Sequence, residues 1–339
     1  MLRIGVIGCG AIAQRRHLTE YLQRNDVEII AVSDQNIERA QQVAKQFSAK
    51  YAFQTHTELL ACNEIDAVSV CTPNFLHAAI SIESMKAGKH VLCEKPMATT
   101  LEDAQKMLEV SREMNVVLMI GHNQRFMPVH MKAREILNSK RLGNVLSFRT
   151  VFGHSGPENW SVDGAKSWFF NQGEAFAGSM GDLGIHKADL IRWLLDDEID
   201  EVTAMYGTLH KKTNVDDHAS FILKMKQGAI GTITTSWTFY PKEDNSTVVY
   251  CEGGTIWIGA DPKYGIIIDN NDGTRELYEL EAMQSNDNGG QTNSGVINHF
   301  VDSVLYGKSV PVTGEDGIRA LEIIFAGIHA AQTRQIIKL

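Results

Sequence analysis

The chain has 339 residues, more than one typical domain needs and enough to build two sizeable cores. Hydrophobic residues make up 43% of the sequence, charged residues make up 22%, and the formal net charge is −9. These values are typical of a globular protein. An acidic chain lacks the basic footprint of a nucleic-acid-binding protein, and no apolar run reaches the length of a membrane span, so we expect neither kind of partner.

The cysteines favour a reducing compartment. There are five of them, an odd number, with no C-x-x-C pair and no zinc spacing: Cys9, Cys62, Cys71, Cys93 and Cys251. Most lie inside apolar runs, which predicts reduced core thiols in a cytoplasmic protein and no metal site. The apolar run at the start of the chain is short and broken by glycines, so we expect no signal peptide.

Strand and helix signals alternate through the first part of the chain. Strands are expected at 2–8, 27–34, 65–73, 90–96 and 116–121, with helices at 11–23, 37–47, 74–88 and 100–114. Thr99 and Glu102 fit a capping box before the last of these helices. Strands that are apolar throughout and alternate with helices predict an α/β, doubly wound parallel sheet of Rossmann type, which we assign to a domain over 1–121.

The pattern changes after Gly121. A helix is expected at 128–140, and strands of antiparallel type at 145–153, 201–209, 218–240, 247–259 and 264–270. "QGAIG" within the long third stretch indicates a hairpin turn. A polar loop is expected at 284–295, followed by helices at 295–307 and 315–335. We therefore expect a second, α+β domain over 122–339 with a large, mostly antiparallel open sheet, which binds the substrate and forms the oligomer.

The stretch "RIGVIGCGAIAQRRH" carries a G-x-G-x-x-A pattern directly after the first strand. Glycine allows a tight turn and a close backbone approach to phosphate, and the following helix offers free N–H groups. The pattern therefore predicts a dinucleotide cradle, against the alternatives of a simple turn or a methyltransferase loop. The candidate cofactor residues here are Gly8, Gly10, Ala11 and Ile12.

Asp34 ends the second strand, 24 residues after Gly10. A carboxylate at this place accepts the ribose hydroxyls of NAD and repels the 2′-phosphate of NADP. Gln35 and Asn36 follow it and bring no arginine for that phosphate. We therefore expect NAD as the cofactor and NADP less, unless Asp34 is only a surface residue at a strand end.

Three longer stretches resemble one known family. They are "CTPNFLHAAISIESMKAGKHVLCEKP" (71–96), "GSMGDLGIHKADLIRWLL" (178–195) and "FVDSVLYGKSVPVTGEDGIRALEII" (300–324). Together they resemble the Gfo/Idh/MocA oxidoreductases, the relatives of glucose–fructose oxidoreductase and inositol 2-dehydrogenase. The resemblance implies reversible hydride transfer on a sugar, a sugar derivative or an inositol-like polyol.

The resemblance also assigns residues. It implies that Lys95, Asp182 and His186 are catalytic, that Lys95 lies beside the nicotinamide, and that Asp182 and His186 reach the substrate. It implies cofactor contacts from Thr72, Pro73, Asn74, His77 and Glu94.

The chemistry of the three catalytic candidates also stands on its own. Oxidising an alcohol needs a base for the hydroxyl proton, and Asp182 and His186 are four residues apart on one helix face. The alternatives are a solvated loop charge for Lys95, a core histidine for His186 and a helix cap for Asp182.

Two further residues, Arg125 in "GHNQRF" and His154 in "VFGH", are candidate substrate contacts near the domain junction. A surface or interdomain packing role is the alternative for each. The resemblance also favours a cis peptide at Lys95–Pro96, where proline makes that form accessible.

The pattern between Ile233 and Phe239 alternates apolar residues with hydroxyls. One strand face can then pack on helices while the other stays open. In the family this open face is a common subunit interface, so we expect a homodimer or homotetramer.

The sequence favours an NAD-dependent dehydrogenase acting on a sugar or polyol. One alternative is a regulator of the same family that binds the dinucleotide without catalysis. Another is an NADP-dependent reductase of sugar ketones or dihydrodiols.

Overall fold

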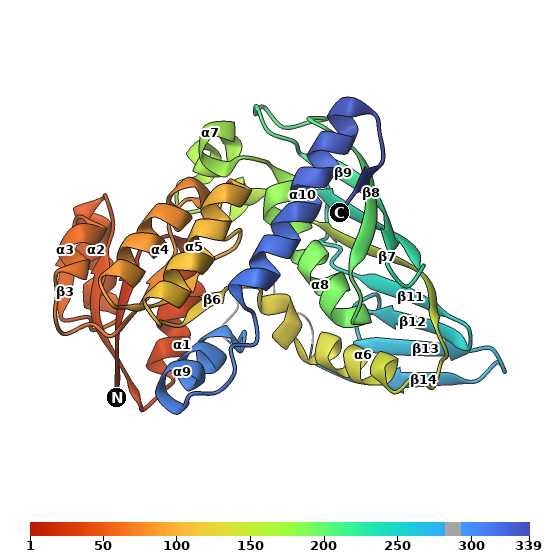
Figure 1. The fold of residues 1–339 in the computed structure, drawn as a ribbon, viewed down its shortest axis with the longest axis horizontal. Coiled ribbons are helices and arrows are strands. Elements are labelled where there is room, and N and C mark those ends of the chain that lie inside the picture. Colours follow the sequence, from red (N-terminus) through yellow and green to blue (C-terminus); the bar gives the residue numbers. More distant parts are fainter. Residues whose placement is uncertain (282–292) are drawn as a thin grey trace.

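The computed structural model describes residues 1–281 and 293–339 and divides them between two sheets with their helices (Figure 1). The first sheet contains β1 (Leu2–Ile7), β2 (Val27–Ser33), β3 (Tyr51–Phe53), β4 (Ala67–Val70), β5 (His90–Cys93) and β6 (Leu118–Ile120). All its pairings are parallel and the order is β3-β2-β1-β4-β5-β6, which is the doubly wound order. The predicted Rossmann-type sheet is confirmed.

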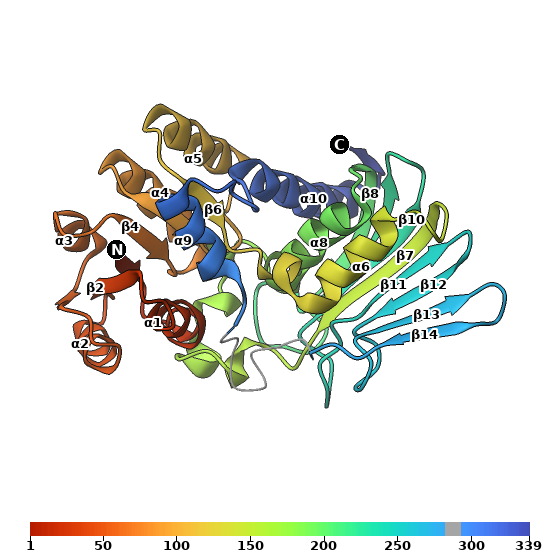
Figure 2. The same cartoon turned by 90° about the horizontal axis from the view of Figure 1, so that it is seen from below.

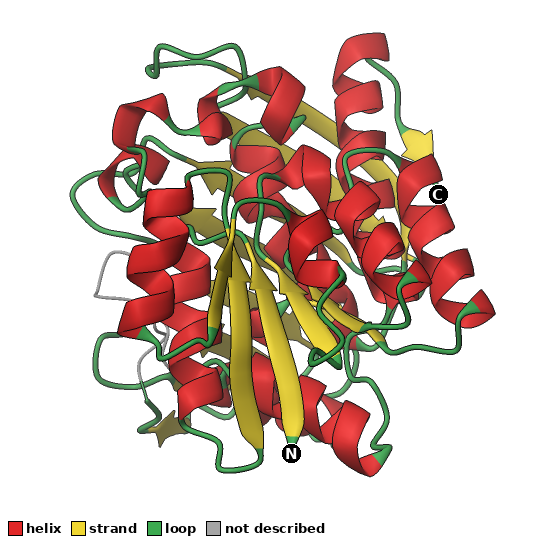
Figure 3. Cartoon of the chain, turned by 90° about the vertical axis from the view of Figure 1, so that its left-hand side faces the viewer, coloured by secondary structure: helices red, strands yellow, loops and turns green. Residues whose placement is uncertain are grey.

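Helices cover both faces of this sheet (Figure 3). They are α1 (Thr19–Leu22), α2 (Ile37–Gln46), α3 (His56–Leu60), α4 (His77–Lys86) and α5 (Leu101–Glu113), with a π-helical stretch over Ala13–Leu18 before α1. The N-cap of α5 is Thr100, whose hydroxyl accepts from the backbone N–H of Asp103. The capping box predicted from Thr99 is therefore wrong by one residue, since Thr100 is the threonine with extended backbone at the helix start.

The second sheet is larger and mostly antiparallel. It contains β7 (Val145–Gly153), β8 (Ile199–Gly207), β9 (His218–Met225), β10 (Ile230–Ser236), β11 (Thr247–Cys251), β12 (Gly254–Ile258), β13 (Ile266–Asn270), β14 (Arg275–Tyr278) and β15 (Ile337–Lys338). Its order is β14-β13-β12-β11-β7-β10-β9-β8-β15, and among the described strands only β7 and β10 pair in parallel. This confirms the predicted sheet of the second half.

One face of the large sheet is covered by helices and the other is open (Figure 2). The covering helices are α6 (Pro128–Asn138), α8 (Ile185–Leu195) and α10 (Gly314–Thr333), while α7 (Gln172–Ala175) and α9 (Val296–Tyr306) lie elsewhere. The hairpin predicted within 218–240 is confirmed: the stretch forms β9 and β10, which pair antiparallel. Its turn contains Gly228 with φ +99°, a conformation that favours glycine.

The end of the chain ties the two halves together. Helix α10 packs against α5 on one side and against α8 and β8 on the other, and the Ile120 N–H donates to the Val312 carbonyl at 3.1 Å. Helix α9 contributes Val296 and Phe300 to an apolar cluster with Tyr21 of the first half. The boundary at residue 121 stays a prediction, and this packing shows that the last segments contact both halves.

The remaining sequence expectations concern single features. The five cysteines are all free thiols. Within the described residues, no helix combines the length and apolarity needed to cross a membrane, and no group of three or more His, Cys, Asp or Glu side chains could hold a metal ion. Most of the polar loop predicted at 284–295 lies outside the residues that the structure describes.

Candidate active site

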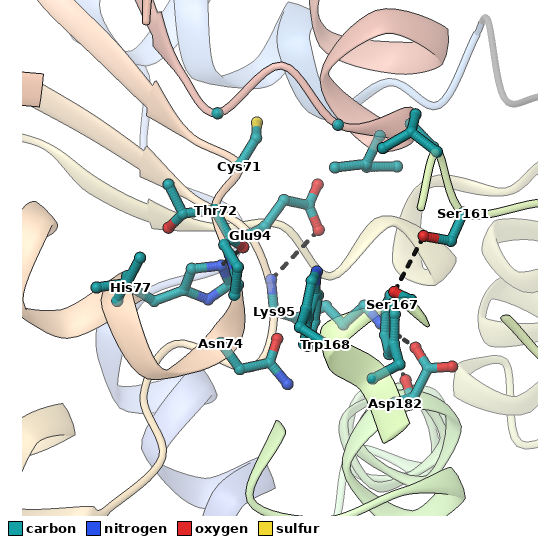
Figure 4. Close-up of a pocket in the computed structure, with 18 of the residues that line it drawn as sticks. Cys71, Thr72, Asn74, His77, Glu94, Lys95, Ser161, Ser167, Trp168 and Asp182 are labelled. Carbon is teal, nitrogen blue, oxygen red and sulfur yellow. Dashed lines mark hydrogen bonds and ion pairs between the residues drawn. The ribbon is translucent and has the colours of Figure 1, made fainter. Parts of the chain in front are cut away.

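A cavity of about 750 Å³ lies where the carboxyl ends of β1, β4 and β5 face the second half of the chain. Figure 4 shows Thr72, Glu94 and Lys95 from the parallel sheet on one side, and Trp168 and Asp182 on the other. The strand order reverses between β1 and β4, and ligands of doubly wound sheets bind at such a switch point. The cavity is therefore the place where both halves can contact one ligand.

The glycine loop lines this cavity through Gly8, Gly10, Ala11 and Ile12. Gly8 has φ +93°, and a Cβ there would lie 2.6 Å from the Cys71 carbonyl oxygen. A Cβ on Gly10 would meet no atom of another described residue within 4 Å, so the backbone at Gly10 faces open space. A helical segment begins directly afterwards. A tight turn, an open approach and a helix start together fit the pyrophosphate of a dinucleotide.

Asp34 also lines the cavity, just after β2. Its Oδ2 accepts from the Cys9 N–H and its Oδ1 from the Asn36 N–H, both at 2.9 Å, so the carboxylate also holds the glycine loop. Arg39, which the sequence analysis missed, lines the same region with Nη1 3.7 Å from Asp34 Oδ2. Its Nη2 also pairs with Asp163 at 2.8 Å.

The segment after β4 brings Thr72, Pro73, Asn74 and His77 to the cavity wall. His77 lies between two carbonyl oxygens, with Nδ1 2.7 Å from that of Pro96 and Nε2 2.8 Å from that of Thr72. Burial lowers the pKa of His77, against the opposing effect of these two contacts. The ring thus connects the ends of β4 and β5.

Lys95 and Asp182 meet in the cavity, as Figure 4 shows. The Lys95 Nζ donates to Asp182 Oδ1 at 2.9 Å and to the Asp182 carbonyl oxygen at 3.0 Å. The second carboxylate oxygen accepts from Trp237 Nε1 at 3.2 Å. The Lys95 side chain is only 14% exposed, so it is not a solvated loop charge. The Lys95–Pro96 peptide is cis, as expected.

His186 lies in the first turn of α8 and lines the same cavity. It follows a π-helical turn over Met180–Gly184 that carries Asp182. Its Nδ1 is buried and has no hydrogen-bond partner in the part of the chain that the structure describes. Burial lowers the pKa of His186 well below its usual value, and Lys95 acts in the same direction. The ring is therefore neutral near pH 7, as a proton acceptor must be.

Glu94 is fixed by two residues of the first helical segment that sequence reasoning did not single out. Arg16 Nη1 donates to Glu94 Oε1 at 3.1 Å, and His17 Nε2 lies 2.8 Å from the same oxygen. Burial by itself would raise the pKa of Glu94, but Arg16 and His17 lower it to about 2. The signal in the sequence is a polar Arg-His pair on the face that the helix buries.

Two expected substrate contacts behave differently. His154 lines the cavity, and its Nδ1 accepts from the Gly156 N–H at 2.9 Å. Arg125 does not line it: its guanidinium donates to both oxygens of Asp189, at 2.8 and 2.5 Å, and to Asp316 at 2.8 Å. Arg125 therefore connects α8 and α10 to the end of the parallel sheet. The expectation that it contacts the substrate is wrong for this reason.

The cavity wall from the second half of the chain is aromatic and amide-rich. Its lining includes Phe152, Trp160, Trp168, Phe169, Gln124 and Asn245. The rings of Trp168 and Phe169 stack with centroids 3.8 Å apart, and the ring of Trp160 packs edge-on against Phe169 at 5.1 Å. Ring faces with neighbouring amides suit a ligand that has both C–H faces and hydroxyl groups.

Comparison with known proteins identifies the family. Residues 2–122 match the model of the "oxidoreductase family, NAD-binding Rossmann fold", and residues 130–257 match the "GFO/IDH/MocA C-terminal domain". A glucose-6-phosphate 3-dehydrogenase of Bacillus subtilis (strain 168) is 31% identical over 252 residues, covering 72% of this chain and 70% of the relative. The chain belongs to the Gfo/Idh/MocA family of oxidoreductases.

Other members match nearly end to end. A myo-inositol 2-dehydrogenase of Thermotoga maritima is 26% identical over 351 residues, covering 100% of this chain and 98% of the relative. A crystal structure of a protein from gentamicin A biosynthesis, in complex with NAD, superposes with a TM-score of 0.86 at 26% identity, covering 100% and 96% of the two chains. As a Gfo/Idh/MocA protein, the chain is an oxidoreductase with a dinucleotide-binding Rossmann fold.

Proposed function

We propose that this protein is an NAD-dependent dehydrogenase that oxidises a secondary alcohol of a sugar or an inositol-like polyol. The observation that carries the proposal is the convergence of Lys95, Asp182 and His186 in the cavity that the glycine loop also lines. A family member that only binds the dinucleotide needs the glycine loop but none of these three side chains. Their presence in one cavity favours an enzyme.

The chain's own residues supply the proton chemistry. His186 takes the proton of the substrate hydroxyl at Nε2, because its other ring nitrogen, Nδ1, is buried. Lys95 donates a hydrogen bond to the same substrate oxygen and stabilises the negative charge that develops on it. Asp182 holds the Lys95 ammonium at 2.9 Å and lines the cavity in which the resemblance expects it to reach the substrate.

A nicotinamide dinucleotide, when bound, supplies the hydride acceptor. Gly8 and Gly10 would hold its pyrophosphate, and Asp34 its ribose hydroxyls. Asp34 supports NAD over NADP because its carboxylate repels a 2′-phosphate. Arg39 close by is already engaged by Asp34 and Asp163.

The substrate class is supported by the relatives and by the cavity wall. Relatives named for myo-inositol, D-glucoside and glucose-6-phosphate oxidation are among the similar proteins. The aromatic rings and amides of the cavity wall suit the C–H faces and hydroxyl groups of such a ring.

We also propose a cytoplasmic homodimer or homotetramer that forms through the open face of the large sheet. Ile222 and Ile230, both more than half exposed, lie on β9 and β10 with Thr232 opposite Ile222. Light scattering at micromolar concentration checks this, with Ile222→Lys expected to shift the protein towards the monomer. A wild-type monomer would contradict it.

The test of the function is a screen for reduction of NAD⁺ with inositols, hexoses, glycosides, sugar acids, sugar phosphates and nucleotide sugars. The proposal expects turnover with at least one cyclic polyol or sugar, and a rate lower by about 10²–10⁴-fold in His186→Ala. Lys95→Met serves as a second variant, with NAD affinity expected to stay within a few-fold. Absence of turnover with every compound, together with tight NAD binding, would favour the regulator instead.

A further inference from the structure

Two imidazole rings lie next to each other behind the cavity. His122 follows β6 and His186 lies on α8. Their ring centroids are 6.3 Å apart, and the ring planes meet at 81°. Both residues are buried, with 1% and 8% of their surface exposed. The fold thus pairs the proposed base with a second histidine from the edge of the parallel sheet.

Three nitrogen atoms of this pair are buried and have no hydrogen-bond partner among the described residues. They are Nδ1 of His186 and both ring nitrogens of His122. A buried polar atom without a partner costs about 1–3 kcal/mol, so such atoms are rare in folded proteins. Three of them around one pair of rings indicate a shared hydrogen-bonding role.

The proposed role of His186 as the base determines which hydrogen bonds its ring must make. A neutral imidazole that accepts a proton at Nε2 must carry its own proton at Nδ1. Once Nε2 is protonated, the positive ring is stabilised if Nδ1–H has an acceptor, as a third group does for the histidine of a catalytic triad. No described residue supplies that acceptor to Nδ1 of His186 directly.

We propose that His122 is a positioning residue for His186. One bridging water accepts a hydrogen bond from Nδ1–H of His186 and donates one to a ring nitrogen of His122. The inference rests on the proposed function, in which His186 is the base. A centroid separation of 6.3 Å is too long for a direct N–H···N bond and suits a water-mediated one. His122 thereby selects the tautomer of His186 that leaves Nε2 free towards the substrate.

The surroundings of His122 favour its neutral form, which can accept a hydrogen bond. Burial lowers the pKa of His122, and Arg125 and Lys95 act in the same direction, while Asp189 and Asp316 oppose them. A neutral ring has one acceptor nitrogen and a protonated ring has none. At neutral pH, His122 therefore has a nitrogen available for the bridge.

Neighbouring carboxylates are already committed. Asp189 uses both oxygens for Arg125, at 2.8 and 2.5 Å. Asp182 uses its two oxygens for Lys95 and Trp237, at 2.9 and 3.2 Å. Neither carboxylate hydrogen-bonds Nδ1 of His186, whereas the ring of His122 lies next to that of His186 with two nitrogen atoms that have no partner among the described residues.

After burial, the groups with the largest effect on the pKa of His186 are cations. Lys95, His122 in its protonated form, Arg16 and Lys187 each lower that pKa, and a neutral His122 exerts no such repulsion. An acceptor at Nδ1 counteracts them by stabilising the protonated ring. His122 therefore makes His186 a stronger base than its cationic surroundings alone would allow.

The test compares His122→Phe, which keeps a ring but removes both nitrogens, with His122→Asn, which keeps an acceptor. His299→Phe, at an exposed histidine outside the cavity lining, is the control. We expect His122→Phe to lower kcat about 10–100-fold with KM and NAD affinity within a few-fold. The rise of kcat with pH that comes from deprotonation of His186 should move to lower pH. His122→Asn should restore most of kcat and of the pH profile.

A second readout does not depend on turnover. Nitrogen NMR of histidine-labelled protein, with the His186 signal assigned from His186→Gln, reports the tautomer of His186 in the free protein. We expect the Nδ1–H form in the wild type and a mixture of both tautomers in His122→Phe. The same tautomer in both proteins, or an unchanged kcat and pH profile in His122→Phe, would overturn the inference. Failure of the wild type to oxidise any alcohol would instead refute the proposed function.

Discussion

Lys187 should limit the stability of the protein near neutral pH. It lies on α8 directly after His186, has no exposed surface, and donates to the Asn245 carbonyl oxygen at 3.1 Å. Burial lowers its pKa from 10.5 to about 7, although Asp244 and Glu243 oppose the shift. Because the unfolded chain binds a proton more tightly than the folded one, stability rises with pH between these two values.

The size of the effect follows from the two pKa values. The lowered pKa of Lys187 reduces the free energy of unfolding by about 4 kcal/mol at pH 7 and by about 2 kcal/mol near pH 9. Above the pKa of the unfolded chain the reduction is almost zero. Lys187→Met keeps most of the apolar stem and removes the titrating amine, but it also removes one hydrogen bond of about 1 kcal/mol. We therefore expect Lys187→Met to stabilise the protein by about 3 kcal/mol at pH 7 and by about 1 kcal/mol near pH 9.

Urea unfolding of both proteins, followed by tryptophan fluorescence across this pH range, measures the difference. Lys86→Met, at an exposed lysine of α4, is the control and should change stability little at any pH. A difference between wild type and Lys187→Met that does not vary with pH would refute the reasoning. It would mean that the buried amine does not lose its proton on folding.

Three further changes test the site and its support. Asp34→Ser should raise the NADP-to-NAD affinity ratio about 100-fold, because Arg39 is freed for the 2′-phosphate; an unchanged ratio in binding titrations would contradict this. Asp182→Asn removes the carboxylate that holds the catalytic lysine and should lower kcat about 10–100-fold in steady-state kinetics, with NAD affinity nearly unchanged. Asp189→Asn removes a carboxylate from buried Arg125 and should cost about 3–5 kcal/mol in urea unfolding, whereas a loss below about 1 kcal/mol would argue against a structural ion pair.

The parts of the site that the sequence predicted are those defined by local spacing. The glycine loop and Asp34 each follow a strand directly, so the strand pattern places them at one sheet edge. The residues after β4 and Lys95 after β5 lie at the same edge, but the family resemblance, not the spacing, singled them out. The Asp182–His186 spacing predicts a shared face, and the structure keeps both in one cavity although a π-helical turn carries Asp182.

The parts that could not be predicted depend on partners far away in the chain. The carboxylates that hold Arg125 lie 64 and 191 residues from it, and spacing does not reveal such pairs. Arg16 likewise reaches Glu94 across 78 residues. The short edge strands β3, β14 and β15 were missed because two to four residues carry no clear alternation.

The central claim is that a hydride passes directly from a substrate carbon to the dinucleotide while His186 takes the hydroxyl proton. The most direct measurement uses a polyol or sugar found in the NAD⁺ screen and labelled with deuterium at the reacting carbon, followed by mass spectrometry of the reduced cofactor. The account predicts full transfer of deuterium to the cofactor in the wild type, and the same transfer at least about 100-fold slower in His186→Ala. Deuterium lost to solvent, or an unchanged rate in His186→Ala, would contradict it.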